Sequence, residues 1–135
     1  MKRRTFLRAI AASLLGLATC GAFAAVPTVE IVAMAHPPVQ AALAPLRQWL
    51  ATQGGKLKVV EVNIETPQGE KRLHSVGLDG HIPILILIDG QYRHHRKDGS
   101  AVAFVNFPAI KDAPSGVRGD WTTADIQAVL AERIK

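Results

Sequence analysis

The chain has 135 residues, which is enough for one domain and too few for two domains of ordinary size. Its formal net charge of +5 is concentrated at the N-terminus, where four of the 16 Lys and Arg residues fall within the first eight positions. The rest of the chain has 12 Lys and Arg residues and all 11 Asp and Glu residues, which is a net charge of +1. This charge gives no support for binding to nucleic acid or to an acidic membrane.

The first residues have the pattern of a secretory signal peptide. The basic head Met1–Arg4 precedes the short apolar run Ala9–Ala18, and residues 22–24 (Ala-Phe-Ala) supply the small-x-small pattern of a cleavage site. The apolar run is shorter than a membrane span requires. We therefore predict a signal peptide over residues 1–24 and one domain over residues 25–135.

The basic head also contains an export motif. The segment Lys2–Arg8 resembles the twin-arginine signal, in which an Arg pair is followed one residue later by Phe-Leu and a base. This resemblance implies a periplasmic protein that crosses the inner membrane already folded. Export through the general secretory route is the alternative.

The single cysteine, Cys20, belongs to the same segment. Residues 17–20 loosely resemble a lipoprotein box, so lipid attached to Cys20 is an alternative to cleavage after Ala24, and only then is membrane contact expected. Cleavage after Ala24 leaves a protein without cysteine. Such a protein cannot form a disulfide bond, and it has no thiolate nucleophile and no cysteine ligand for a metal.

The first half of the predicted domain alternates strand and helix patterns. The β-branched run Thr28–Met34 predicts a buried strand, and helical spacing of apolar residues from Val39 predicts an amphipathic helix that ends at Gly54-Gly55. A second strand over Lys56–Ile64 and a short helix to about Val76 follow. Parallel pairing of these two strands through the first helix is expected.

The second half has antiparallel character. The nearly continuous apolar run His81–Ile88 predicts a strand buried on both faces, and Asp89-Gly90 predicts a tight turn. Strands over Gln91–Arg96 and Ala101–Phe107 and a helix over Thr123–Ile134 complete the chain. This order predicts an α/β fold, with a mixed sheet flanked by helices and an extra β-hairpin before the C-terminal helix.

The strand Lys56–Ile64, followed about twenty residues later by Gly80–Gly90 with its Ile82-Pro83 pair, resembles thioredoxin. The resemblance covers about Val29 to Arg96 and the closing helix. It implies a thioredoxin-like sheet, with Pro83 as a cis-proline facing the start of the first helix. The Cys-x-x-Cys motif of that family is absent, because residues 36–40 read His-Pro-Pro-Val-Gln. The resemblance therefore implies a redox-inactive member.

In the thioredoxin arrangement, the loop at the start of the first helix and the loop before Pro83 meet at one edge of the sheet. We therefore predict a binding groove there, which suits an extended peptide. Its residues are His36, Pro37, Gln40, His81, Ile82 and Pro83. Two imidazoles could also hold part of a metal site, which would need a third ligand that the sequence does not identify. The alternative is that both histidines are solvated loop residues.

A second candidate surface lies near the predicted hairpin. Arg93 and Arg96 are part of a basic cluster that is either a docking site for an acidic partner or the charged protection of an edge strand. Strand alternation sends His94 and His95 to opposite faces, which argues against chelation by this pair. Phe107 and Trp121 either complete the core or form an exposed patch for a partner.

The sequence lacks paired carboxylates at glycosidase-like positions, a glycine-rich phosphate loop and a recognisable Ser-His-Asp arrangement. It therefore favours a binding or adaptor protein over an enzyme. The expected partner is another exported protein or an extended peptide, not nucleic acid. No cofactor is predicted. The alternative function is periplasmic metal binding or delivery through His36 and His81, and a thiol-independent enzyme in the same groove is a third hypothesis.

Overall fold

The computed structural model describes residues 25–134, which hold all of the predicted strands and helices of the domain. The predicted signal peptide over residues 1–24, with its twin-arginine motif and Cys20, lies outside the described residues. Within the described part, no helix is both long and apolar enough to cross a membrane.

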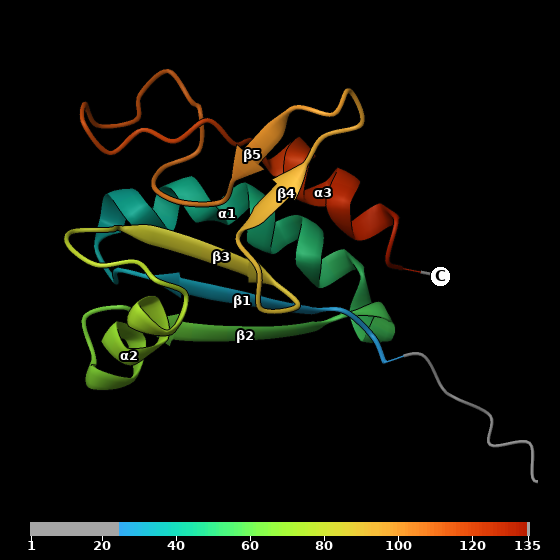
Figure 1. The fold of residues 1–135 in the computed structure, drawn as a ribbon, viewed down its shortest axis with the longest axis horizontal. Helices are drawn as coiled ribbons and strands as arrows, with labels where there is room; N and C mark the ends of the chain where they lie inside the picture. The colour runs from blue at the N-terminus through green and yellow to red at the C-terminus, as the bar shows by residue number, and fades with distance from the viewer. Residues whose placement is uncertain (1–24, 135) are drawn as a thin grey trace, which may run out of the picture.

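The central sheet has three strands, β1 (Thr28–Ala33), β2 (Lys58–Asn63) and β3 (Ile84–Ile88), in the order β2-β1-β3. β1 runs parallel to β2 and antiparallel to β3, so the predicted mixed sheet is confirmed (Figure 1). All five residues of β3 are buried. A strand that is covered on both faces has no polar side, which explains the unbroken apolar run in its sequence.

The helices α1 (Pro37–Thr52) and α2 (Pro67–Ser75) connect these strands, and a short 3₁₀ turn, η1 (Gly54–Lys56), follows α1. Both α-helices begin with proline in the first turn, where its missing N–H costs no hydrogen bond. The Thr66 hydroxyl caps α2 by accepting a hydrogen bond from the Gly69 amide at 3.2 Å.

The two helices cover opposite faces of the sheet. Arg47 of α1 bonds Glu61 of β2, whereas Arg72 of α2 bonds Glu30 of β1. Glu61 is level with Ile31 and Glu30 is level with Val60, so the two glutamates belong to alternate positions along the strands. Because alternate side chains of a strand point to opposite faces, α1 and α2 lie on opposite sides.

The second half adds the predicted hairpin. Strands β4 (Arg93–His95) and β5 (Ala101–Ala103) pair antiparallel, and α3 (Thr123–Ala131) lies beside them (Figure 1). β5 is shorter than the predicted strand over residues 101–107. The chain leaves the hairpin after Ala103 and returns to the central sheet, where the Asn106 amide donates to the Ile84 carbonyl at 2.8 Å.

Aromatic packing closes the core between the hairpin and α3. Trp121 and Phe104 are fully buried with their rings at an edge-to-face angle, and Phe107 is 5% exposed. The Trp121 indole N–H donates to the Asn106 carbonyl at 3.1 Å, which satisfies its one polar group. The hypothesis that Phe107 and Trp121 form an exposed docking patch is therefore wrong, and the core alternative is confirmed.

The predicted cis-proline is also wrong, because residues 25–134 contain no cis peptide bond. Pro83 is buried, and its carbonyl accepts a hydrogen bond from the Met34 amide at 3.0 Å. Upstream of this bond, Gly80 has a φ of +82°, which glycine adopts without strain. The Ile82–Pro83 bond has the trans form, which is intrinsically favoured.

Candidate functional site

Three loops meet at the edge of the sheet where β1 and β2 end and β3 begins. The Met34 amide bonds the Pro83 carbonyl at 3.0 Å, and the Ile64 amide bonds the Ala33 carbonyl at 3.0 Å. These two bonds place the residues after β1, the residues after β2 and the residues before β3 side by side. The resemblance to thioredoxin predicted that the first and third of these loops meet.

His36 is positioned by the start of α1. It occupies the N-cap position with extended backbone, and its side chain makes no capping hydrogen bond. The imidazole turns instead toward the loop after β2, where Nε2 lies 3.0 Å from Oε1 and 3.1 Å from Oε2 of Glu65. The Glu65 amide in turn bonds the Asn63 side-chain oxygen at 2.9 Å, which fixes that loop. His36 and Glu65 therefore form an exposed pair at the sheet edge.

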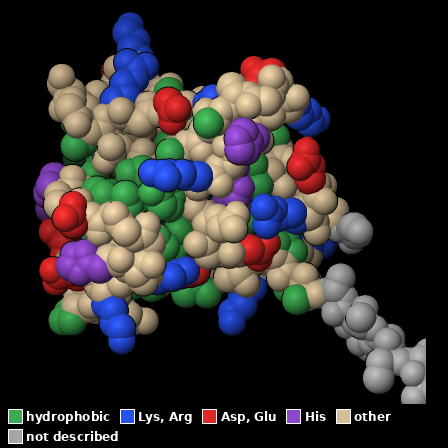
Figure 2. Space-filling view, viewed as in Figure 1, with side chains coloured by type: hydrophobic (Ala, Val, Ile, Leu, Met, Phe, Trp, Pro, Cys, Tyr) green, Lys and Arg blue, Asp and Glu red, His purple; other side chains and the backbone are tan. Residues whose placement is uncertain are grey.

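Beside this pair is a hollow of about 370 Å³. We call it the His–Glu hollow, and it combines an apolar floor with a polar rim. Its lining residues are Met34, Ile64, Glu65, Glu70, Leu73, His74, Gly80, His81 and Ile82. Figure 2 shows histidine and acidic side chains gathered on the side of the molecule where α2 and the loop after it lie.

The charges around the hollow have one sign. Glu65 and Glu70 are both exposed at its rim, and no Lys or Arg is among the lining residues. The rim therefore presents two carboxylates and no Lys or Arg side chain, and the buried side chains of Met34, Ile64 and Leu73 lie below it. Such a site suits a ligand group with a cationic tip and an aliphatic stem.

The predicted groove is only partly assembled. His81 and Ile82 line the hollow, and His36 reaches it through Glu65. Gln40 does not line the hollow. Its side-chain amide donates to the Met34 carbonyl at 2.7 Å, and its side-chain oxygen accepts from Arg47 at 2.8 Å.

The remaining two groove residues differ in exposure. Pro37 is exposed in the first turn of α1, and Pro83 is buried under the loop. Pro37, Gln40 and Pro83 therefore do not line the His–Glu hollow, and their part in a binding groove stays a prediction. Gln40 belongs to the α1 side of the sheet, whereas His81 lies on the α2 side.

Metal binding by His36 and His81 remains a prediction. Among residues 25–134, no three His, Asp or Glu side chains are arranged so that they could hold a metal ion. The metal content of the purified protein is the measurement that tests it.

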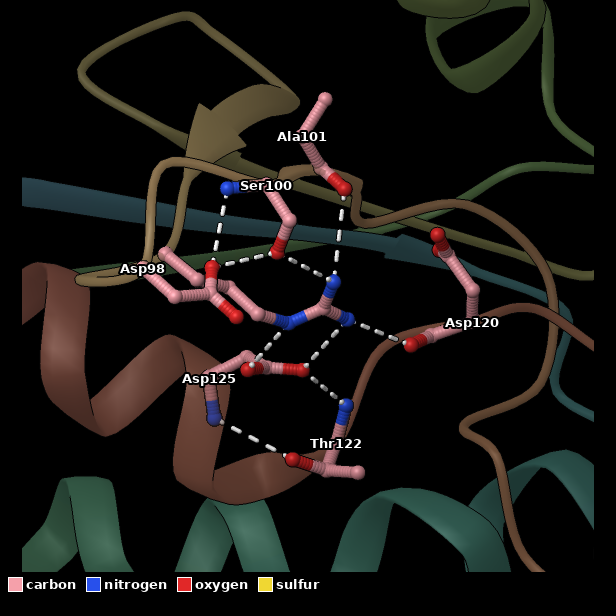
Figure 3. Close-up of polar contacts among 7 residues, drawn as sticks. Asp98, Ser100, Ala101, Asp120, Thr122 and Asp125 are labelled. Carbon is pink, nitrogen blue, oxygen red and sulfur yellow. Dashed lines mark hydrogen bonds and ion pairs between the residues drawn. The ribbon is translucent and has the colours of Figure 1, made fainter.

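The two arginines of the basic cluster on the hairpin, Arg93 and Arg96, have different surroundings. Arg93 is exposed, with its guanidinium 5.1 Å from the centre of the Tyr92 ring, and is free to meet a partner. Arg96 is engaged within the protein: it bonds both carboxylate oxygens of Asp125 and the Asp120 carbonyl (Figure 3). Arg96 therefore holds the hairpin to α3.

The two histidines of the hairpin lie on opposite faces, as predicted, because His94 is 7% exposed and His95 is exposed. The His94 ring stacks on Phe104 with 5.0 Å between centroids, and Nε2 lies 2.9 Å from the Gln91 carbonyl oxygen. Burial lowers the pKa of His94 below its ordinary value, with the hydrogen bond to Gln91 acting in the opposite sense. This histidine is a core residue.

Three polar side chains of the hollow are not among the predicted site residues: Glu65, Glu70 and His74. A signal for each was present. Glu65 directly follows the end of a strand that was expected to run parallel to the first, and the ends of parallel strands share one edge. Glu70 and His74 are four residues apart on a predicted helix and so lie on one face.

No known protein family, curated protein or solved structure matches this chain. The fold and the site define a mixed α/β protein with a hollow rimmed by carboxylates and histidines at one edge of its sheet.

Proposed function

We propose that this chain is an exported, periplasmic thioredoxin-fold protein without thiol-disulfide chemistry, and that it binds another exported protein. The occupant of the His–Glu hollow is a lysine or arginine side chain on an extended segment of that partner. The β2-β1-β3 order with mixed pairing supports the thioredoxin-like part of the proposal. The lack of cysteine beyond Cys20 supports the redox-inactive part.

The observation that carries the binding role is the position of Glu65. This carboxylate is shared between the His36 imidazole and the rim of the hollow, and Glu70 adds a second negative charge without any base among the lining residues. The apolar floor accepts the methylene stem of a long basic side chain, while the carboxylates receive its charged end.

The first experiment measures peptide binding to the protein exported to the periplasm. Two synthetic extended peptides differ only in a central Lys or Glu, and fluorescence anisotropy gives the affinity of each. We expect the Lys peptide to bind, and Glu65→Gln to weaken it about tenfold, the value of one charge-assisted hydrogen bond. The control is Glu132→Gln at the C-cap of α3, which changes the same charge away from the hollow.

The second experiment tests the partner. Affinity capture from the periplasm compares wild type, Glu65→Gln and Glu132→Gln, followed by mass spectrometry. A protein retained by wild type and by the control, but lost with Glu65→Gln, supports the proposal. Equal retention by all three proteins, together with equal affinity for the Lys and Glu peptides, contradicts it.

A further inference from the structure

β2 is an outer strand of the sheet, and no strand of residues 25–134 pairs with its outer side. The amide of Lys58 bonds the Pro27 carbonyl at 2.9 Å, and the amide of Ile64 bonds the Ala33 carbonyl at 3.0 Å. In a parallel sheet, the backbone N–H and C=O groups of every second residue of a strand bond the same adjacent strand, and those of the residues between point the opposite way. The N–H and C=O groups of Val59 and Glu61 therefore point away from β1, toward the open edge.

These outward groups are not occupied elsewhere in the described structure. No backbone hydrogen bond outside the sheet involves Val59 or Glu61, and the Val59 side chain is 41% exposed. The edge thus offers a row of unused donors and acceptors, which is the feature that an extended segment recognises when it adds a strand to a sheet.

A hollow flanks the edge on each face of the sheet. The hollow on the α1 face, of about 380 Å³, is mainly apolar and is lined by Leu50, Ala51, Leu57 and Val59, with Arg47 and Glu61 at its side. The hollow on the α2 face, of about 320 Å³, lies over Val60 and Val62 and is bordered by Lys71 and Arg72. Because the side chains of an added strand alternate between faces, both hollows would receive them.

The charged side chains on the two faces indicate which kind of segment would pair with the edge of β2. Glu61 is paired with Arg47 at 2.6 Å, and Glu30 is paired with Arg72 at 2.6 Å. Lys58 and Lys71 form no ion pair within residues 25–134, and both lie toward the α2 face. Around the hollow of Val60 and Val62 the uncompensated charge is therefore positive, because Glu65 and Glu70 line the His–Glu hollow instead. A second copy would add its own Lys58 and Lys71 to the same face, so like charges oppose self-pairing.

We propose that the outer edge of β2 docks an extended acidic segment of another protein as a fourth strand. Its backbone pairs with Val59 and Glu61, its apolar side chains enter the hollow on the α1 face, and its alternate Asp or Glu side chains meet Lys58 and Lys71 on the α2 face. This surface is separate from the His–Glu hollow and does not depend on the function proposed for it. The same lysines that oppose self-pairing select the acidic partner.

The test uses amide hydrogen exchange, read by NMR on the isotope-labelled exported protein. The probes are two synthetic peptides with an alternating Val-Xaa pattern, in which Xaa is Glu in one and Lys in the other. We expect the Glu peptide to slow exchange at the Val59 and Glu61 amides, and the Lys peptide to leave both unchanged. Lys71→Glu should reduce the protection by the Glu peptide, whereas Lys97→Glu, on the hairpin turn, should not.

A backbone variant tests the pairing directly. Val59→Pro removes the outward N–H and leaves the β1–β2 bonds in place, since edge strands tolerate proline where the N–H faces solvent. Binding of the Glu peptide should be lost with Val59→Pro and kept with the matched variant Val59→Thr. If Val59→Pro does not fold, the Lys71→Glu result decides.

Three outcomes overturn the inference. The first is unchanged exchange at Val59 and Glu61 in the presence of the Glu peptide, and the second is equal protection by both peptides. The third is protection that grows with protein concentration without any peptide, which would make a second copy the occupant.

Discussion

Arg96 and Asp125 form a two-pronged ion pair between the hairpin and α3: Nε lies 2.9 Å from Oδ1, and Nη2 lies 3.2 Å from Oδ2. The same carboxylate accepts the Thr122 amide at 2.9 Å, while the Asp125 amide bonds the Thr122 hydroxyl at 3.2 Å. This reciprocal pair is a capping box, which stabilises the first turn of a helix. One aspartate therefore both caps α3 and attaches β4 to it.

Arg96→Lys should loosen the hairpin. A lysine ammonium cannot reproduce the planar fork on Asp125 or reach the Asp120 carbonyl at the same time. We expect a lower melting temperature and faster amide exchange in β4 and β5, with the central sheet unaffected. Arg93→Lys is the matched control, because Arg93 is exposed and makes no ion pair within residues 25–134. Equal losses in the two variants would show that the fork adds nothing beyond positive charge.

His94→Phe should flatten the dependence of stability on pH. Burial lowers the pKa of His94 below its ordinary value of 6.5, so below about pH 6.5 the unfolded chain binds more protons at this residue than the folded protein does. Wild type therefore loses stability as the pH falls from about 7 to about 5.

Phenylalanine at position 94 keeps a ring against Phe104 and does not titrate. The Gln91 carbonyl still accepts the Ile88 amide at 2.9 Å, so it is not left unpaired. Chemical denaturation at several pH values measures the effect. A His95→Phe control, at an exposed position, should retain the wild-type slope, and a His94→Phe protein with that same slope would argue against a buried neutral imidazole.

Gly69→Ala should destabilise the packing of α2 on β2. A Cβ at this position would lie 2.2 Å from the Asn63 carbonyl oxygen and 2.5 Å from the Ile64 Cα, and backbone atoms cannot yield as a flexible side chain can. We expect a loss of about 1–3 kcal/mol in the free energy of unfolding, the usual cost of overpacking. Gly55→Ala is the control, because nothing lies within 4 Å of a Cβ there. Unfolding curves of the two variants that coincide would contradict the close approach.

Asp89→Asn should weaken the fold at neutral pH and much less in acid. The Thr28 amide and then the Arg133 guanidinium hold the pKa of Asp89 below its ordinary value, at distances of 2.9 Å and 2.6 Å. A carboxylate with a lowered pKa stabilises the fold above its unfolded-state pKa, and that contribution is lost as the pH falls through the folded-state pKa.

Asparagine tolerates the positive φ of 49° at position 89 and still accepts the Thr28 bond, so the variant isolates the charge. The expected loss at pH 7 is about 1 kcal/mol or less, because the pair is partly exposed. Denaturation at about pH 7 and below about pH 3 measures it. A difference from wild type that is the same at both pH values would rule out the ionised carboxylate as its source.

Local patterns predicted the elements well. The unbroken apolar run before Asp89 became the fully buried strand β3, and Asp89-Gly90 forms the expected tight turn, with positive φ at both residues. The strand alternation of His94 and His95 is also as predicted. These features depend on residues within a few positions of one another, where periodicity and turn chemistry act directly.

The candidate site was predicted less well. The loops that hold His36 and His81 meet as expected, but the carboxylate between them, Glu65, was missed. Gln40 was assigned to this site because residues 36–40 occupy the position of the thioredoxin motif, but its side chain bonds the Met34 carbonyl and Arg47 on the α1 side of the sheet. These partners are set by the packing of α1 against β1 and β2, which no local sequence pattern contains.

The sequence by itself determined the order of strands and helices, their mixed pairing, the buried position of β3 and the lack of cysteine chemistry beyond Cys20, because each follows from composition or from local periodicity. Only the tertiary structure decided that Glu65 meets His36 across 29 positions, that Arg96 is held by Asp125 and that Trp121 is fully buried. Contacts between distant residues depend on the path of each loop and on how side chains fill the space between layers, which no local pattern contains.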